Sequence, residues 1–281
     1  MPEIAILLTT YNGSQFLKEQ IDSLVAQTYQ HWQLYVRDDQ SEDETPRLLT
    51  ALAETEPRIH ILRDPQKRGA KHGFMWLLQQ VDAPFYMFCD HDDVWLPDKI
   101  ELSMKAMQAQ PDAATLPFIV CTDAELADAQ LHTLSPSYWK HKQYRQDMFN
   151  DKYYHLFYNY ILVCTMLFNR QARQVALPYP TDTAMHDSWL AASVLWNGGR
   201  ILPVNIPLMR YRQHSGNTIG APQPPSLLQQ FTHFRPLLGK TIVQHRASQT
   251  LTRLSLPVFF LLKAKYSIQE HFRRSFKKNT P

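Results

Sequence analysis

A regular alternation of short apolar runs with segments of helical period constrains the fold most strongly. The run IAILLT at 4–9 precedes residues 16–25, in which apolar side chains recur every three to four positions. Further apolar runs follow at 32–37, 59–62, 85–89 and 118–122, and helical patterns lie between them. Ser41 and Glu44 have the S-x-x-E form of a capping box, which predicts the start of the second helix. Because strands that alternate with helices form right-handed crossover units, the pattern predicts an α/β fold with a mostly parallel sheet.

The composition is that of an ordinary globular protein with a substantial core. The chain has 281 residues, of which 44% are hydrophobic and 20% charged. Its net charge of +3 is too small to predict nucleic-acid binding, although it suits a phosphate-bearing ligand. The three cysteines are far apart in apolar surroundings, so we expect neither a disulfide framework nor a zinc site. This cysteine usage and the absence of a basic, cleavable leader predict a cytoplasmic protein.

Polar and acidic residues follow several of the predicted strands. The strand ends read Thr9-Thr10-Tyr11-Asn12-Gly13, Asp38-Asp39, Asp90-His91-Asp92-Asp93 and Thr122-Asp123. Ligands of parallel α/β sheets bind outside the carboxyl ends of the strands. A single aspartate there could be only a turn or N-cap residue, but several carboxylates on one rim repel each other unless a cation joins them. The cluster therefore predicts a divalent metal ion.

The sequence favours magnesium or manganese over structural calcium. The segment HDDVWLPDKIE that follows Asp90 contains no glycine, and so it does not form an EF-hand loop. Two or three carboxylates that leave room for water and diphosphate oxygens are typical of magnesium sites. The chain also lacks G-x-G-x-x-G and G-x-x-x-x-G-K-[ST], and thus a phosphate would be held by the metal and basic side chains.

Six strings in order resemble the family 2 glycosyltransferases of GT-A fold, and most closely their bacterial rhamnosyltransferase-like branch. They are TTYNG, RDDQSEDET, YMFCDHDDVWLPDKIE, NYILVCTMLFNR at 159–170, MHDSWLA at 185–191 and PLMRYRQHSGNTIG at 207–220. The resemblance implies a GT-A type, Rossmann-like sandwich over residues 1–221. Its nucleotide-sugar half would span about 1–123 and its acceptor half about 124–221. Residues 222–281 would form a helical, basic C-terminal extension.

The resemblance also implies roles on the donor side of the site. Thr10, Tyr11 and Asp39 would form the nucleotide pocket. Asp90 and Asp92 match the D-x-D pair, with Asp92 as the metal ligand and Asp90 contacting the ribose of the donor or bound water. The implied cofactor is Mg²⁺ or Mn²⁺, and the implied donor is dTDP-rhamnose or a UDP-hexose.

Two later residues complete the implied site. Asp187 matches the family's catalytic base, which would take the proton of the attacking hydroxyl in an inverting displacement. His214 matches a histidine that approaches the metal or the diphosphate. From the residues alone, Asp187 could instead be the N-cap of the next helix, and His214 an ordinary surface or core histidine.

The resemblance implies an inverting, metal-dependent hexosyltransferase that acts on a hydroxyl of a growing or lipid-linked bacterial surface glycan, such as lipopolysaccharide O-antigen or capsule. A sugar nucleotidyltransferase is an alternative, although such enzymes normally begin with a glycine-rich loop. A second alternative is a non-catalytic protein that binds a nucleotide-sugar.

Some segments depart from the family pattern or have two interpretations. Residues 64–73 are unusually basic, and Arg68 could hold diphosphate or only solvate a loop. Val163 stands where a glycine is usual. The aromatic segment 144–160 could line an acceptor cleft or cover core. The basic, apolar tail could be a peripheral anchor at the inner face of the membrane, a solvated tail or a dimer contact.

Overall fold

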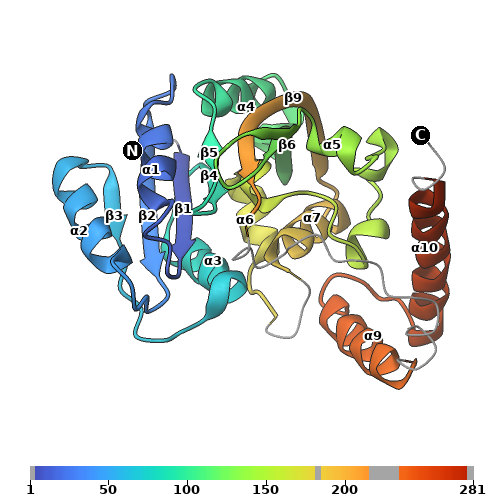
Figure 1. Cartoon of the computed structure of the whole chain (residues 1–281). Coiled ribbons are helices and arrows are strands. Elements are labelled where there is room, and N and C mark those ends of the chain that lie inside the picture. The colour runs from blue at the N-terminus through green and yellow to red at the C-terminus, as the bar shows by residue number, and fades with distance from the viewer. Residues whose placement is uncertain (1–3, 181–184, 215–233, 277–281) are drawn as a thin grey trace.

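A computed structural model describes residues 4–180, 185–214 and 234–276, and it confirms the α/β fold (Figure 1). The strands are β1 (Ile4–Thr10), β2 (Trp32–Asp38), β3 (Ile59–Ile61), β4 (Phe85–Cys89), β5 (Val94–Trp95), β6 (Phe118–Ala127), β7 (Thr133–Ser135), β8 (Met166–Asn169) and β9 (Arg200–Arg212). The helices are α1 (Leu17–Val25), α2 (Thr45–Thr55), α3 (Gly69–Gln80), α4 (Lys99–Gln108), α5 (Tyr138–His141), α6 (Arg170–Ala176), α7 (His186–Trp196), α9 (Phe234–Ser248) and α10 (Leu256–Phe276).

One sheet carries the site, and most of its strands run in the same direction. The order is β3-β2-β1-β4-β8-β6-β9-β5, and β7 pairs with β6. Strands β1, β2, β3 and β4 pair in parallel, whereas β8 lies between β4 and β6 and is antiparallel to both. Since β9 is parallel to β6, it also runs in the direction of β4. The carboxyl ends of β1, β2, β4, β6 and β9 therefore lie at one edge of the sheet.

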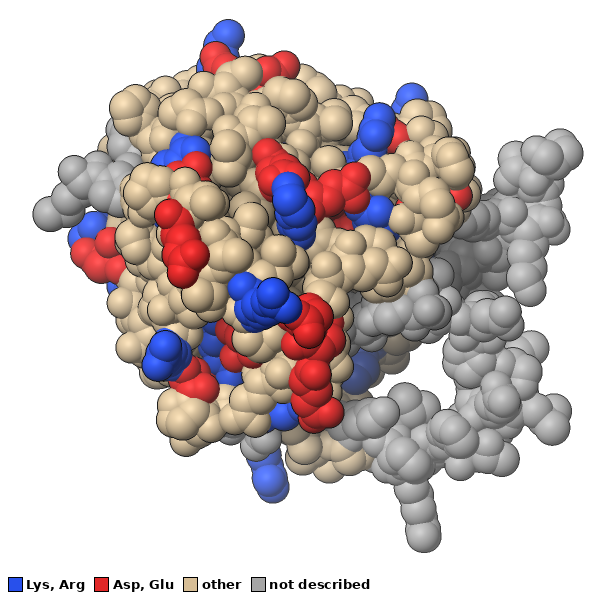
Figure 2. Space-filling view, turned by 60° about the vertical axis from the view of Figure 1, so that its left-hand side comes forward, with Lys and Arg blue, Asp and Glu red and all other residues tan. Residues whose placement is uncertain are grey.

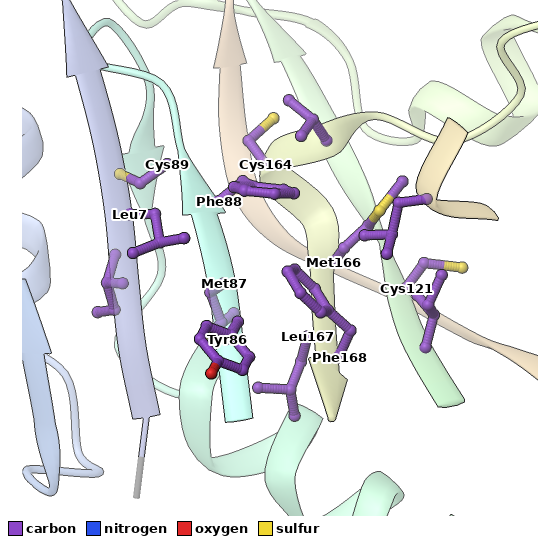
Figure 3. Close-up of a cluster of buried hydrophobic side chains, with 14 of the residues drawn as sticks. Leu7, Tyr86, Met87, Phe88, Cys89, Cys121, Cys164, Met166, Leu167 and Phe168 are labelled. Carbon is purple, nitrogen blue, oxygen red and sulfur yellow. The ribbon is translucent and has the colours of Figure 1, made fainter. Parts of the chain in front are cut away.

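The core is continuous across the pairing of β4 with β8. Every residue of β1 is buried, as expected for a strand in the middle of a sheet with both faces covered. Figure 3 shows Phe88 of β4 beside Phe168 of β8, and their ring centroids are 5.1 Å apart. The three cysteines are buried and free. The core thus fixes β4, the strand that leads into residues 90–93, which we call the acidic turn.

The capping box predicted for the second helix is wrong. Helix α2 begins at Thr45, and Glu44 makes no side-chain capping bond. Ser41 Oγ accepts a hydrogen bond from the backbone N–H of Asn12, and Asp43 Oδ1 accepts one from the backbone N–H of Thr45. The loop after β2 is therefore tied to the loop after β1 and cannot adopt the local geometry of a capping box.

The expected end of the fifth strand is also wrong. Strand β6 continues to Ala127, so that Asp123 lies within it and not at the site. The carboxylate of Asp123 is buried and accepts hydrogen bonds from the Ser137 hydroxyl and from the backbone N–H of Trp139. It holds the start of α5, which is a structural role. The predicted boundary between residues 123 and 124 falls inside this strand.

The aromatic segment 144–160 covers core and holds the C-terminal helices. Tyr154 donates to Glu270 Oε1 at 2.6 Å, and Phe157 packs edge-on against Phe259 with centroids 5.0 Å apart. Helices α9 and α10 lie beyond α7, on the side of the molecule away from β3 (Figure 1). None of the described helices is long and apolar enough to cross a membrane. The predicted linker at 221–226, together with Lys277 and Lys278, lies outside the described residues.

The surface on the side of the first two helices carries charges of both signs. Figure 2 shows lysine and arginine side chains next to aspartate and glutamate side chains in several places. Lys18 and Asp22, for example, form an exposed ion pair at 2.6 Å. Such pairs are typical of a solvated surface and contribute little to stability.

Candidate active site

Three carboxylates lie in the turn between β4 and β5, at the carboxyl edge of the sheet. Asp90 and Asp92 are partly exposed, whereas Asp93 is fully buried. Asp93 Oδ1 accepts the backbone N–H of Arg212 at 3.1 Å, but its Oδ2 has no hydrogen-bond partner among the described residues. Loss of hydration and the neighbouring Asp92 charge raise the pKa of Asp90 to about 7. This concentration of negative charge fits a cation site.

His214 reaches the same turn from the end of β9. Its Nε2 lies 2.8 Å from Asp92 Oδ2. The two residues are 122 positions apart in the chain, and the antiparallel pairing of β5 with β9, which sets Val94 opposite Arg210, brings them together. Both side chains remain partly open to solvent, at 16% and 14% exposure. The predicted pair Asp92 and His214 is thus adjacent in space.

A second group of possible metal ligands lies deeper. Ligand atoms of Asp90, Asp93 and Cys164 all lie within 4.8 Å of one another. Burial raises the pKa of the Cys164 thiol well above its ordinary value, which disfavours the thiolate that binds metals. Magnesium and manganese prefer oxygen ligands and open positions for substrate. Asp92 and His214, which are partly open to solvent, suit such an ion better than this buried group.

Asp187, in the first turn of α7, lies close enough to the acidic turn for its charge to contribute to the raised pKa of Asp90. Its neighbour His186 packs edge-on against Phe88, two residues before Asp90, with ring centroids 5.5 Å apart. The carboxylate accepts hydrogen bonds from the backbone N–H of Ser188 at 2.7 Å and from the side-chain amide of Asn159. Burial raises the pKa of Asp187 to about 6, and these bonds limit the rise.

The position of Asp187 bears on its alternative role as an N-cap. Helix α7 begins at His186, and its N-cap residue is Met185. Asp187 is therefore not the N-cap, although its bond to Ser188 satisfies one free N–H of the first turn. Asn159 belongs to a string that the sequence singled out, but its contact with Asp187 was not predicted.

The predicted nucleotide residues follow β1 and β2. Thr10 is buried, and its hydroxyl has no partner among the described residues, whereas Tyr11 is 41% exposed beneath Lys67. Asp39 is buried and accepts the backbone N–H groups of Arg68 at 2.7 Å and Gly69 at 2.8 Å. Its backbone N–H donates to Thr10 at 2.8 Å. The three residues therefore lie together at the carboxyl ends of adjacent strands.

Arg37 is a buried residue of this region that the sequence did not single out. Its guanidinium donates to Asp39 Oδ1 at 2.6 Å, to Asp64 Oδ2 at 3.0 Å and to the main-chain oxygen of Gln66 at 2.5 Å. Arg68 also binds the Asp64 carboxylate, so in this structure its side chain holds the loop. The sequence did contain a signal for this buried ion pair, because an arginine stands at the end of a mostly apolar strand, just before two aspartates.

Comparisons with known proteins agree with this geometry. Residues 5–172 match the family described as Glycosyl transferase family 2. A UDP-Glc:alpha-D-GlcNAc-diphosphoundecaprenol beta-1,3-glucosyltransferase, WfgD, from Escherichia coli is 31% identical over 37% of this chain and 40% of its own length. The putative teichuronic acid biosynthesis glycosyltransferase TuaG of Bacillus subtilis is 26% identical over 38% of this chain and 42% of its own. The matches thus span less than half the length of these relatives.

Solved structures of low sequence identity share the fold. Residues 1–349 of Staphylococcus aureus TarS, in complex with UDP-GlcNAc, align with a TM-score of 0.60 and 14% identity, over 94% of this chain and 71% of that one. The mannosyltransferase PcManGT of Pyrobaculum calidifontis, in complex with GDP-Man and Mn²⁺, aligns with a TM-score of 0.60 and 17% identity, over 99% and 83%. These likenesses confirm the GT-A fold. Because the family match covers more than half of the sequence, this chain belongs to glycosyl transferase family 2.

Proposed function

We propose that the chain is an inverting, metal-dependent glycosyltransferase that moves a sugar from a nucleotide-diphosphate donor to a hydroxyl of a bacterial surface glycan, such as lipopolysaccharide O-antigen or capsule. The observation that carries the proposal is the position of Asp187 opposite the D-x-D turn. The Asp187 charge contributes to the raised pKa of Asp90. The ring of His186, the residue before Asp187, also contacts the ring of Phe88, two residues before Asp90. This proximity supports the proposal that a base and a diphosphate site serve one anomeric carbon.

Asp187 would be the catalytic base. With a pKa of about 6 it is ionised at neutral pH, and it is still basic enough to take a proton from the attacking hydroxyl. Asn159 and the N–H of Ser188 hold the carboxylate in one orientation. Attack from the side of Asp187, opposite the leaving diphosphate, would invert the anomeric configuration.

Asp92 and His214 would hold the metal ion, with Asp90 toward the ribose of the donor or bound water. When bound, Mg²⁺ or Mn²⁺ supplies positive charge to the leaving diphosphate. The residues fit such an ion because a carboxylate and an imidazole already converge at the solvent-accessible end of the turn. Asp93, beneath them, would remain a structural carboxylate bonded to the backbone of Arg212.

Thr10, Tyr11 and Asp39 would receive the nucleotide. A carboxylate has about four acceptor positions, and Asp39 uses three of them on N–H groups of Arg37, Arg68 and Gly69. One position is left for an N–H or O–H of the base or ribose. The relatives name UDP-Glc and UDP-GlcNAc, which supports a UDP-hexose, and dTDP-rhamnose remains the other candidate.

The acceptor would be a lipid-linked glycan at the cytoplasmic face of the membrane, as the substrate of the Escherichia coli relative suggests. Helix α10, in the proposed C-terminal extension, exposes Leu261 at 72% and Ile268 at 57%, and Lys265 lies between them on the same side. An apolar stripe with a lysine suits the surface of an anionic bilayer. Leu261→Ser with Ile268→Ser should weaken sedimentation with anionic liposomes, whereas the matched change of exposed Leu134 and Ile206 should not.

The test of the function is a donor panel of UDP-, dTDP- and GDP-sugars, with Mn²⁺ or EDTA, read by thermal shift and by transfer to a lipid-linked acceptor. A ligand at 100 times its Kd stabilises the native state by about 2.7 kcal/mol. We expect donor-induced stabilisation with Mn²⁺ and none with EDTA or in Asp92→Ala, while Asp98→Ala, an exposed control, behaves like the parent. Full-affinity donor binding in EDTA would show that binding needs no metal ion. Donor binding without sugar transfer would indicate a non-catalytic protein.

A further inference from the structure

Arg212 ends β9 and connects three separate segments of the chain. Its Nε donates to the main-chain oxygen of Asp92 at 2.7 Å, and its Nη1 donates to that of Ala129, also at 2.7 Å. Its Nη2 donates to Glu19 Oε2 of α1 at 2.5 Å. The residue is only 2% exposed. A buried guanidinium whose three nitrogens all donate hydrogen bonds is held in one orientation. It therefore restrains the positions of the three groups that accept those bonds.

Arg212 holds the peptide unit that joins Asp92 to Asp93. Its backbone N–H donates to Asp93 Oδ1 at 3.1 Å, while its side chain binds the carbonyl of Asp92. These two bonds restrain the C-terminal end of the turn, because one acts on the main-chain oxygen of Asp92 and the other on the side chain of Asp93. Because the direction of a side chain follows from its backbone, they also restrain where the Asp92 carboxylate points.

The same residue bears on His214, two positions later. The Arg212 guanidinium lies 4.5 Å from the centroid of the Phe16 ring, and the His214 ring lies 4.7 Å from that ring. One buried phenylalanine thus supports both side chains. A displaced Arg212 would move the end of β9 and, with it, the imidazole that meets Asp92 at 2.8 Å.

Lysine could not replace this residue. The acceptors are two neutral carbonyls and one carboxylate in different directions, which suit a planar fork of five N–H donors and not a single ammonium group. Glu19, whose side chain is 51% exposed, supplies the only charge in this set. The main effect of the Arg212 guanidinium is therefore to fix the relative positions of its acceptors, and neutralising the charge of Glu19 is secondary.

We propose that Arg212 is the positioning residue that assembles the metal site, by fixing the Asp92 turn and His214 in one relative geometry. The inference rests on the proposed function in that it takes Asp92 and His214 as metal ligands. Outer residues that orient metal ligands typically affect metal affinity by about 10- to 100-fold.

The test uses Arg212→Lys, Arg212→Met and, as a matched control, Arg210→Met. Arg210 lies on the same strand with 40% of its side chain exposed and only a 3.7 Å contact to Glu125. Mn²⁺ affinity is measured by the paramagnetic resonance of free Mn²⁺, and amide hydrogen exchange of residues 88–96 is measured without metal. We expect both Arg212 variants to bind Mn²⁺ about 10- to 100-fold more weakly and to exchange faster in this segment, with kcat reduced, while the control matches the parent.

The outcomes separate this proposal from the proposed function. If the parent itself binds no Mn²⁺, the metal assignment fails, and exchange in residues 88–96 still decides whether Arg212 positions the turn. Folded Arg212 variants that match the parent in both Mn²⁺ affinity and exchange would overturn the proposal. If neither variant folds, Glu19→Ala removes one exposed partner of the guanidinium. The Glu19→Ala variant should weaken Mn²⁺ binding by a smaller factor. Unchanged Mn²⁺ affinity and unchanged amide exchange in this variant would also overturn the proposal.

Discussion

Replacing Asp187 with asparagine should make the protein more stable and nearly inactive. The native environment raises the pKa of this carboxyl from 3.8 to about 6, because burial disfavours its charged form. At pH 8 the group is ionised in both folded and unfolded chains, and the folded state bears the cost of burying the charge. A shift of about two pKa units corresponds to ~3 kcal/mol. The neutral amide of the asparagine variant would not bear that cost, and its oxygen can still accept the N–H of Ser188.

The sign of the pH dependence follows from proton binding. Between pH 3.8 and about 6 the folded parent binds more protons at Asp187 than the unfolded chain does. The contribution of this group to stability therefore falls as pH rises through that window. The asparagine variant should exceed the parent in free energy of unfolding by up to ~3 kcal/mol at pH 8, and the difference should close near pH 4.

Urea unfolding at pH 4, 5, 6 and 8 would measure this difference, and transfer assays would give the loss of activity. We expect turnover to fall about 100- to 10,000-fold, the usual effect of removing a positioned base, while parent activity declines below about pH 6. The exposed Asp98→Asn should alter neither quantity. If the Asp187 variant were less stable than the parent at pH 8, its two hydrogen bonds would outweigh the cost of burial. If it turned over at the parent rate, the base would lie elsewhere.

Further predictions concern stability on the nucleotide side of the sheet and in the C-terminal helices. Arg37→Met should lower the free energy of unfolding by about 3–5 kcal/mol, because it removes the buried positive charge that pairs with two buried carboxylates, whereas exposed Arg47→Met should change little in the same urea titration. Gly73→Ala should destabilise by about 1–3 kcal/mol, since its Cβ would lie 2.8 Å from Thr9 Oγ1 and 2.9 Å from Arg37 Nη1. By contrast, Gly239→Ala, in α9 with open space around it, should raise the unfolding free energy by about 1 kcal/mol. A destabilising Gly239 change, or a neutral Gly73 change, would contradict these contacts.

The sequence predicts those parts of the fold that depend on local pattern. The runs of β1 and β4 are continuously apolar, that of β2 is mostly apolar, and all three are bounded by polar turns, so their position and parallel pairing follow from periodicity and crossover rules. The acidic turn after β4 is contiguous with its strand, and its place at the edge of the sheet follows directly. The resemblance to a known family identified Asp187 and His214, which no local pattern could have linked to that turn.

Long-range pairing could not be predicted in the same way. The four residues of β8 are apolar like any short core segment, and nothing local indicates that they pair with β4 and β6 in an antiparallel direction. Asp123 looked like a strand-end carboxylate because its partners, Ser137 and Trp139, come from a loop whose path depends on the whole fold. Arg37 appeared to be a polar position of a strand, and only the fold shows that its charge is buried against Asp64.

The separation of Asp92 from His214 has a consequence for the newly made protein. A ribosome adds about 5–20 residues per second, so the 122 residues between them take about 6–24 s to synthesise. During that interval the strands of the nucleotide side can already fold, but the acidic turn has neither its imidazole partner nor the end of β9 against it. An incomplete chain would present repelling carboxylates with only part of their ligand set. If the proposed metal site is correct, ion capture should therefore begin only after β9 has emerged.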